Sequence, residues 1–209
     1  MEKKLESSLT NMLLVLTGVA VIMGAVLAWV NSVTSGPISE QKAKTLADGI
    51  KIVMDCDGLT VAHTDTIHQN DAKGKEQTFI IYHTQDAEGA ALGAAVESTS
   101  LGFGGNLKVL VGFNPDGDVL GYTLLEHAET PGLGAKADKW FQKGEKGNII
   151  GKNPQQPLTV SKDGGQVDAI TASTITSRAF LLAVNNAYKA YKATPDADAE
   201  TGATIQNHK

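Results

Sequence analysis

The chain has 209 residues, of which 42% are hydrophobic and 20% are charged, so it is long enough and apolar enough to bury a core. Its formal net charge of −5 argues against a nucleic-acid-binding protein, which needs a basic surface. A single cysteine, Cys56, excludes an intrachain disulfide and a cysteine-only zinc or iron–sulfur centre, and the five histidines form no HxxxH or HExxH pair, so we expect no metal site.

An uncharged apolar segment lies close to the N-terminus. No charged residue occurs from Ser7 to Ser39, and residues 12–30 are almost continuously apolar. About 20 such residues in a helix span the hydrocarbon core of a bilayer, which is about 30 Å thick. A cleaved signal peptide is the alternative, but its apolar region is typically only about 7–15 residues long. We therefore expect residues 1–34 to form a short cytoplasmic stub and a retained transmembrane helix.

The charges that flank this helix do not decide its orientation. Lys3 and Lys4 precede it, whereas Lys42, Lys44 and Lys51 follow it. Long domains also translocate largely regardless of charge. A short head followed by a large domain is typical of a signal anchor. We therefore expect a single-pass protein of a bacterial inner membrane, with its soluble domain on the extracytoplasmic, periplasmic side.

Residues 35–193 are predicted to form one α+β domain with an antiparallel sheet and flanking helices. Gly36-Pro37 is expected to end the membrane segment, and helical spacing of apolar residues predicts a new helix from Ile38 to Met54. Apolar runs bounded by turns predict strands over 78–84, 90–98, 107–113 and 119–127. The turn over 114–118 joins the last two strands in a hairpin.

The C-terminal third is predicted to be less regular until its last helix. A short helix is expected over 137–143, followed by an irregular segment over 149–160 that could include a strand. Apolar residues over 174–193 predict a helix with one broad buried face. Residues 194–209 are polar and are expected to form a mobile tail.

Two loops carry more information than folding requires. Gly102–Gly105 has three glycines in four residues, which indicates a tight loop or a backbone that lies close to another group. Residues 126–134 (EHAETPGLG) contain Thr130-Pro-Gly, which is typical of a type II turn. Such a turn exposes backbone N–H groups that could hold a ring edge or an anion, although turns with this chemistry are also common without a ligand.

A third segment opens the last predicted helix. Five of the ten residues over 168–177 (DAITASTITS) bear hydroxyl groups. Ser173 or Thr174 could simply cap the helix, which needs only one such residue. A hydroxyl cluster at a helix N-terminus is also suited to a phosphate group. These residues alone leave both interpretations open.

The order of these segments resembles a known family. The anchor, the GFGG segment, the ETPGLG loop and the segment Asp168–Thr174 are similar to the FMN-binding domain of the G subunit of Rnf-type electron transport complexes, and more distantly to the C subunit of the Na⁺-translocating NADH:quinone oxidoreductase. The resemblance covers about residues 1–192. It implies that FMN is joined by a phosphoester to the last threonine of an Asp-x-x-[Ser/Thr]-Gly-Ala-Thr motif, here Thr174. A flavin transferase makes this bond in the family, by transferring the FMN half of FAD to the threonine oxygen.

The segment Asp168–Thr174 differs from the family's motif at two positions, and a second segment of the chain also matches the motif. Ala172 and Ser173 stand where the family usually has Gly and Ala, and both are small. The tail segment Asp198–Thr204 matches the motif more closely, which makes Thr204 an alternative acceptor. We predict Thr174, because it opens a helix that the fold must contain.

The resemblance also implies which residues contact the cofactor. The expected contacts are Glu129, Thr130, Leu133 and Gly134 in the loop, and Thr171, Ala172 and Ser173 beside the acceptor. His127 could lie near the flavin ring, but a structural role at the end of a strand is the more common one.

The resemblance implies an electron-relay subunit rather than an enzyme with its own substrate site. The other membrane subunits would be its partners in a translocase that couples electron transfer between ferredoxin and NAD⁺ to Na⁺ or H⁺ movement. We expect the ion-transport residues in those other subunits, because the anchor contains no ionisable residue. The alternatives are a stand-alone extracytoplasmic flavoprotein, the C subunit of the Na⁺-translocating oxidoreductase, and an anchored scaffold in which the hydroxyl cluster is only a helix cap.

Overall fold

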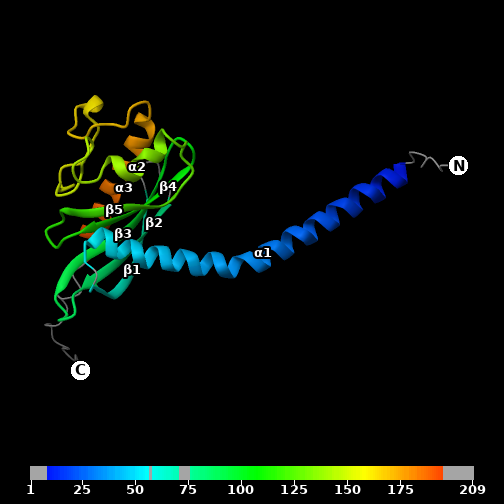
Figure 1. Cartoon of the computed structure of the whole chain (residues 1–209), viewed down its shortest axis with the longest axis horizontal. Helices are drawn as coiled ribbons and strands as arrows, with labels where there is room; N and C mark the ends of the chain where they lie inside the picture. Colours follow the sequence, from blue (N-terminus) through cyan, green and yellow to red (C-terminus); the bar gives the residue numbers. More distant parts are fainter. Residues whose placement is uncertain (1–8, 57, 71–75, 195–209) are drawn as a thin grey trace, which may run out of the picture. The chain divides into compact units, whose positions relative to one another are not determined.

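The N-terminal apolar segment belongs to one long helix. The computed structural model describes residues 9–56, 58–70 and 76–194, and it begins with α1 (Leu9–Met54) (Figure 1). The predicted helix break at Gly36-Pro37 is wrong, because Pro37 lies inside α1. The hydroxyls of Thr34, Ser35 and Ser39 donate to helix carbonyls around the proline. The acceptors are the carbonyls of Val30, Ser32 and Gly36, whereas the N–H that Pro37 lacks would have bonded the Val33 carbonyl, four residues before it.

The chain divides into two compact units within α1, between Thr45 and Leu46. In the first unit, α1 is long and apolar enough to cross a membrane. Its large apolar side chains, such as Leu13, Leu16 and Trp29, are exposed and build no protein core. This part of α1 is therefore compatible with a single-pass membrane anchor.

The second unit is built on a five-stranded antiparallel sheet in which each strand pairs with its neighbour in sequence. The strands are β1 (Thr60–Asn70), β2 (Glu76–Gln85), β3 (Ala91–Leu101), β4 (Asn106–Phe113) and β5 (Val119–His127). The four predicted strands and the hairpin of β4 and β5 are confirmed. β1 was missed because its half-buried face carries mainly polar side chains, among them His63 and Asp65, so that it lacks an apolar alternation.

Helices cover both faces of this sheet. On one face, α3 (Thr174–Ala193) packs on apolar side chains that alternate along the strands, such as Val109, Val111 and Phe113 of β4. The end of α1 packs on the other face, where Ile50, Val53 and Met54 contact Ala95 and Leu110. The predicted α+β fold is confirmed.

Two glycines let the end of α1 lie close to the sheet. Gly112 of β4 and Gly121 of β5 are direct partners in the ladder. A side chain at either position would collide with the backbone of Val53. The backbone of α1 therefore approaches this part of the sheet more closely than side chains would allow.

The segment between β5 and α3 contains little regular secondary structure, as predicted. It contains η1 (Gly134–Lys136), α2 (Ala137–Trp140) and η2 (Ser161–Asp163). The strand that could have occurred within 149–160 reduces to one isolated bridge, Val160 with Val167. The predicted mobile tail and the alternative acceptor Thr204 lie outside the described residues, apart from Thr194.

An aromatic cluster holds this segment against the sheet. The rings of Phe141 and Phe180 stack with centroids 4.2 Å apart, and Tyr122 meets Phe180 edge-on at 4.7 Å. The buried Tyr122 hydroxyl donates to the Ala137 carbonyl over 2.7 Å and accepts from the Phe141 N–H over 3.2 Å. Burial raises the pKa of Tyr122 well above its usual value, so it stays neutral. These contacts hold α2, which follows the loop after β5, against the sheet.

Candidate functional site

A cavity of about 380 Å³ lies where the β3–β4 loop, the loop after β5 and the N-terminus of α3 meet. Its size is within the range of small-molecule sites, about 300–1,000 Å³. The predicted contact residues line it, with the exception of Thr171, which is exposed next to Ala172. The lining residues are Phe103, Glu129, Thr130, Leu133, Gly134, Ala172, Ser173, Thr174 and Ile175.

The buried carboxylate of Glu129 joins the three segments of the cavity. Its Oε1 accepts the backbone N–H groups of Phe103 (2.8 Å) and Gly104 (3.2 Å) in the β3–β4 loop. Its Oε2 accepts the Thr176 hydroxyl from the first turn of α3, over 2.7 Å. A charged acceptor of three hydrogen bonds is a strong link between loops. Glu129 therefore organises the site as well as lining it.

The glycines around the cavity make room for this carboxylate. A side chain at Gly102 would collide with Glu129 Oε1, and one at Gly134 would collide with Glu129 Oε2. A side chain at Gly104 would likewise collide with the Ala128 carbonyl. The sequence allowed two interpretations of Gly102–Gly105, a tight loop or a backbone that lies close to another group. Both apply, because the Gly102 N–H donates to the Gly105 carbonyl over 2.8 Å and the segment lies against Glu129 and Ala128.

The turn after β5 has the predicted geometry. The Leu133 N–H donates to the Thr130 carbonyl over 3.1 Å, and Gly132 has a φ of +77°. A positive φ at the third residue defines a type II turn and favours glycine. The turn presents Thr130 and Leu133 to the cavity.

Helix α3 begins at Thr174 without a side-chain cap. Ser173 is the N-cap residue, but its side chain makes no capping hydrogen bond. Its hydroxyl is instead 2.9 Å from the Thr176 hydroxyl, which continues the network of Glu129. The interpretation of Ser173 as a simple side-chain cap is therefore wrong. The positive end of the helix dipole faces the cavity with its first N–H groups available to an anion.

Lysine supplies further positive charge next to the predicted acceptor. Lys162 Nζ donates to Thr174 Oγ1 over 3.3 Å. The η2 segment that carries Lys162 is tied to α3 by a two-point ion pair, in which Arg178 donates to both oxygens of Asp163 over 2.6 and 2.7 Å. Arg178 lowers the pKa of the Asp163 carboxyl, so the pair is charged at neutral pH. A hydroxyl with a cation and a helix N-terminus beside it is suited to a phosphate ester.

Ala172, which precedes Ser173 and Thr174, has a strained backbone. Ala172 has a φ of +61°, in the left-handed region that glycine adopts without cost. The glycine that is usual at this position in the resembling family thus has a conformational reason. Ala172 is the smallest side chain that retains a Cβ, which limits the strain.

Sequence reasoning missed three residues of the site. Phe103 and Ile175 line the cavity and remain 70% and 53% exposed, beside Leu133 at 42%. Phe103 lies within the Gly102–Gly105 segment and Ile175 directly follows Thr174, so an apolar residue in or next to a motif was a usable signal. Lys162 had no signal, because it reaches Thr174 only through the fold. His127 is not among the lining residues; its Nδ1 accepts the Glu129 N–H over 3.3 Å, which is the expected structural role.

Residues 102–189 match the FMN-binding domain family, and this range includes both loops and nearly all of α3. The fold and the cavity thus define an FMN-binding domain protein with an N-terminal apolar helix. The chain is 34% identical over 174 residues to the G subunit of the ion-translocating oxidoreductase complex of Shewanella piezotolerans, and the match covers 79% of this chain and 81% of that protein. The same subunit of Vibrio cholerae is 33% identical over 181 residues, with 83% and 86% covered.

A third relative matches more closely over a shorter stretch. The G subunit of Aliivibrio fischeri is 39% identical over 131 residues, which cover 60% of this chain and 61% of that protein. The chain belongs to the family of G subunits of ion-translocating oxidoreductase complexes. The resemblance stated from the sequence is therefore confirmed.

A solved structure supports the fold. The crystal structure of Shewanella oneidensis NqrC matches with a TM-score of 0.52 and 14% identity, over 74% of this chain and 100% of that chain. At this identity the match concerns the fold alone.

Proposed function

We propose that the chain relays electrons in an ion-translocating oxidoreductase complex and carries one FMN covalently on Thr174. The observation that carries this proposal is the position of the Thr174 hydroxyl. It lies in the cavity at the first turn of α3, 3.3 Å from Lys162 Nζ. The N-terminus of α3 and Lys162 together favour a phosphate at this oxygen.

The same geometry supports a flavin transferase as maturation partner. Attachment forms a bond between Thr174 Oγ1 and the FMN-side phosphorus of FAD, breaks the bond between the two phosphates and releases AMP. The threonine proton must leave, and the hydrogen bond that the structure gives this oxygen comes from Lys162, an ammonium donor that cannot accept the proton. We therefore assign the base, and the catalysis of attachment, to a separate enzyme.

The rest of the cavity fits the other parts of FMN. Phe103, Leu133 and Ile175 offer apolar surface for a flavin ring, and the Thr130 turn offers polar groups beside it. When bound, FMN supplies one-electron transfer chemistry. The three apolar side chains are 42–70% exposed, so a ring held among them would remain close to the protein surface. Partner subunits could then approach it, which an electron relay requires.

The relatives supply the setting of this relay. They are subunits of an ion-translocating oxidoreductase complex, so other subunits are expected as partners. We propose that the complex couples electron transfer between ferredoxin and NAD⁺ to Na⁺ or H⁺ movement. The apolar part of α1, up to Ser39, contains no ionisable residue, which supports placing ion transport in other subunits. Membership of this family favours the relay over a stand-alone flavoprotein or a scaffold.

The relay is tested in the membranes of the native host. We expect Thr174→Ala to abolish ferredoxin-dependent NAD⁺ reduction while the variant protein still co-purifies with the complex. Thr171→Ala is the matched control, because Thr171 belongs to the same segment but does not line the cavity. Full activity of the Thr174→Ala membranes would contradict the proposal.

We also propose that the soluble unit lies on the extracytoplasmic side of the inner membrane. The half-buried Cys56, the chain's single cysteine, lies two residues after the end of α1 and serves as a probe of sidedness. A membrane-impermeant maleimide should label it in intact spheroplasts as fully as in lysed membranes, and Cys56→Ser should remove the signal. Labelling that requires lysis would place the unit in the cytoplasm.

A further inference from the structure

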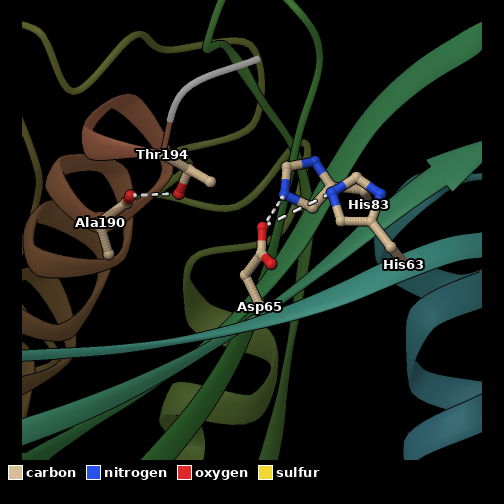
Figure 2. Close-up of polar contacts among 5 residues, drawn as sticks. All are labelled: His63, Asp65, His83, Ala190 and Thr194. Carbon is tan, nitrogen blue, oxygen red and sulfur yellow. Dashed lines mark hydrogen bonds and ion pairs between the residues drawn. The ribbon is translucent and has the colours of Figure 1, made fainter. Parts of the chain in front are cut away.

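Two histidines and an aspartate converge on the edge of the sheet, away from the flavin cavity (Figure 2). His63 of β1 and His83 of β2 are direct partners across the ladder, and Asp65 follows two residues after His63 on the same face. Asp65 Oδ2 lies 3.2 Å from His83 Nε2 and 3.5 Å from His63 Nε2. The Nε2 atoms of both histidines thus lie beside the same carboxylate oxygen.

We propose that His63, Asp65 and His83 bind one divalent transition-metal ion of the zinc class. Bonds of about 2.0–2.1 Å in a tetrahedral site place neighbouring ligand atoms about 3.4 Å apart. Both measured nitrogen–oxygen distances are close to this value, and all three ligand atoms lie within 4.8 Å of one another. Two imidazoles and one carboxylate favour Zn²⁺, Co²⁺ or Ni²⁺ over Mg²⁺ or Ca²⁺, which prefer oxygen ligands.

Binding requires a small rearrangement of the two rings. They stack with centroids 4.0 Å apart and an interplanar angle of only 9°. The lone pairs of parallel rings do not converge on one point, so at least one ring must rotate about its side-chain bonds. His63 is 39% exposed, against 17% for His83, so His63 is the ring with room to turn.

Solvent can reach the site and complete the coordination. Both histidines line an open cavity of about 220 Å³, together with Pro115 and Tyr191. Thr194 is drawn in the same view, but its hydroxyl donates to the Ala190 carbonyl over 3.1 Å (Figure 2). We therefore assign the fourth position to water. Three protein ligands and one water make an accessible, exchangeable site rather than a closed structural one.

The location separates this site from flavin chemistry. Tyr191 beside the metal cavity and Thr174 in the flavin cavity lie near opposite ends of α3, about 25 Å apart along the helix at 1.5 Å per residue. Among the described strands, β1 lies at the edge of the sheet and pairs with β2. An ion held by both strands would therefore fasten the edge of the sheet.

No local sequence pattern indicates this site, and no metal was expected. Histidine pairs at the i, i+4 spacing bind metals from a helix. Here the ligands come from a strand pair, at i and i+2 on β1 and at the opposite position on β2. Strand register, which is non-local, brings them together.

The test is calorimetric titration of ZnCl₂ into the untagged full-length protein, purified in detergent and freed of metal with a chelator. We expect one ion per chain, at least tenfold weaker binding in His63→Gln, Asp65→Asn and His83→Gln, and a melting temperature raised by roughly 5–10 °C at a hundredfold excess over Kd. His68→Gln is the control, because His68 also lies on β1 but, among the described residues, pairs with the single carboxylate of Glu76 at 3.3 Å and belongs to no metal-binding cluster.

Two further readouts keep the result decisive. Co²⁺ should give the intense visible absorption of a four-coordinate ion in the wild type and in His68→Gln, and not in His63→Gln. Circular dichroism checks that each variant is folded. If His83→Gln is not folded, the comparison rests on His63→Gln and Asp65→Asn, which replace more exposed side chains. No saturable binding, or binding that persists undiminished in folded His63→Gln and Asp65→Asn, would overturn the proposal.

Discussion

The Thr176 hydroxyl donates a 2.7 Å hydrogen bond to the buried carboxylate of Glu129, 47 residues earlier in the chain. This bond fastens the first turn of α3 to the loop after β5. The other carboxylate oxygen binds the backbone of the β3–β4 loop at Phe103 and Gly104. The shape of the cavity between these segments therefore depends on one side chain.

We expect Glu129→Gln to destabilise the protein and reduce its flavin content. An amide keeps the size of the side chain but removes the negative charge that strengthens all three hydrogen bonds, and an NH₂ group that faces Thr176 would force its hydroxyl to change from donor to acceptor. The expected loss is about 1–3 kcal/mol of unfolding free energy. Urea denaturation of the detergent-solubilised protein measures it.

The control is Glu88→Gln at an exposed turn, which should change stability by no more than about 0.5 kcal/mol. Thr176→Val completes a double-mutant cycle with Glu129→Gln. A coupling energy of about 0.5 kcal/mol or more is expected for groups in contact. Additive effects of the two substitutions would show that the bond does not link the loops energetically.

Local chemistry made much of this site predictable. The type II turn at Thr130 and the start of α3 at Thr174 depend on residues adjacent in sequence, and both were predicted correctly. The contact of Glu129 with Thr176 and the position of Lys162 depend on how distant segments pack. No local pattern encodes them.

The same distinction explains the errors in the fold. β1 has a period of two in burial, but its half-buried face is mostly polar, so hydrophobicity did not reveal it. Pro37 is a reliable helix breaker in water. The helix α1 nevertheless continues through Pro37, and helices that cross membranes tolerate proline more often than helices in water.

A second prediction concerns the backbone at Ala172. Ala172→Gly removes strain of about 1–2 kcal/mol at φ +61°, and the greater freedom of glycine in the unfolded chain offsets about 0.4–1 kcal/mol of it. We therefore expect stability and covalent flavin content equal to or above wild type. Ala172→Val should lower both, because a β-branched side chain is strongly disfavoured at this φ. Wild-type flavin content in Ala172→Val would show that this backbone conformation is not required for attachment.

A third prediction concerns the rate of flavin attachment. Lys162→Gln keeps a hydrogen-bond donor but removes the positive charge beside Thr174. We expect attachment about three- to tenfold slower, which corresponds to roughly 0.7–1.4 kcal/mol of electrostatic stabilisation at a partly exposed site. In-gel flavin fluorescence, followed over time during co-expression with a flavin transferase, measures the rate. Lys146→Gln, at an exposed position outside the cavity lining, should leave it unchanged.

Peptide mass spectrometry of the protein purified from its own host tests the central claim most directly. We predict that the peptide containing Thr174 gains the mass of one FMN less one water, and that fragmentation assigns the gain to Thr174. In Thr174→Ala this modified peptide should be absent, whereas Thr204→Ala should leave it unchanged. Flavin found on Thr204, or FMN that is released completely on denaturation, would contradict the assignment of a phosphoester to Thr174.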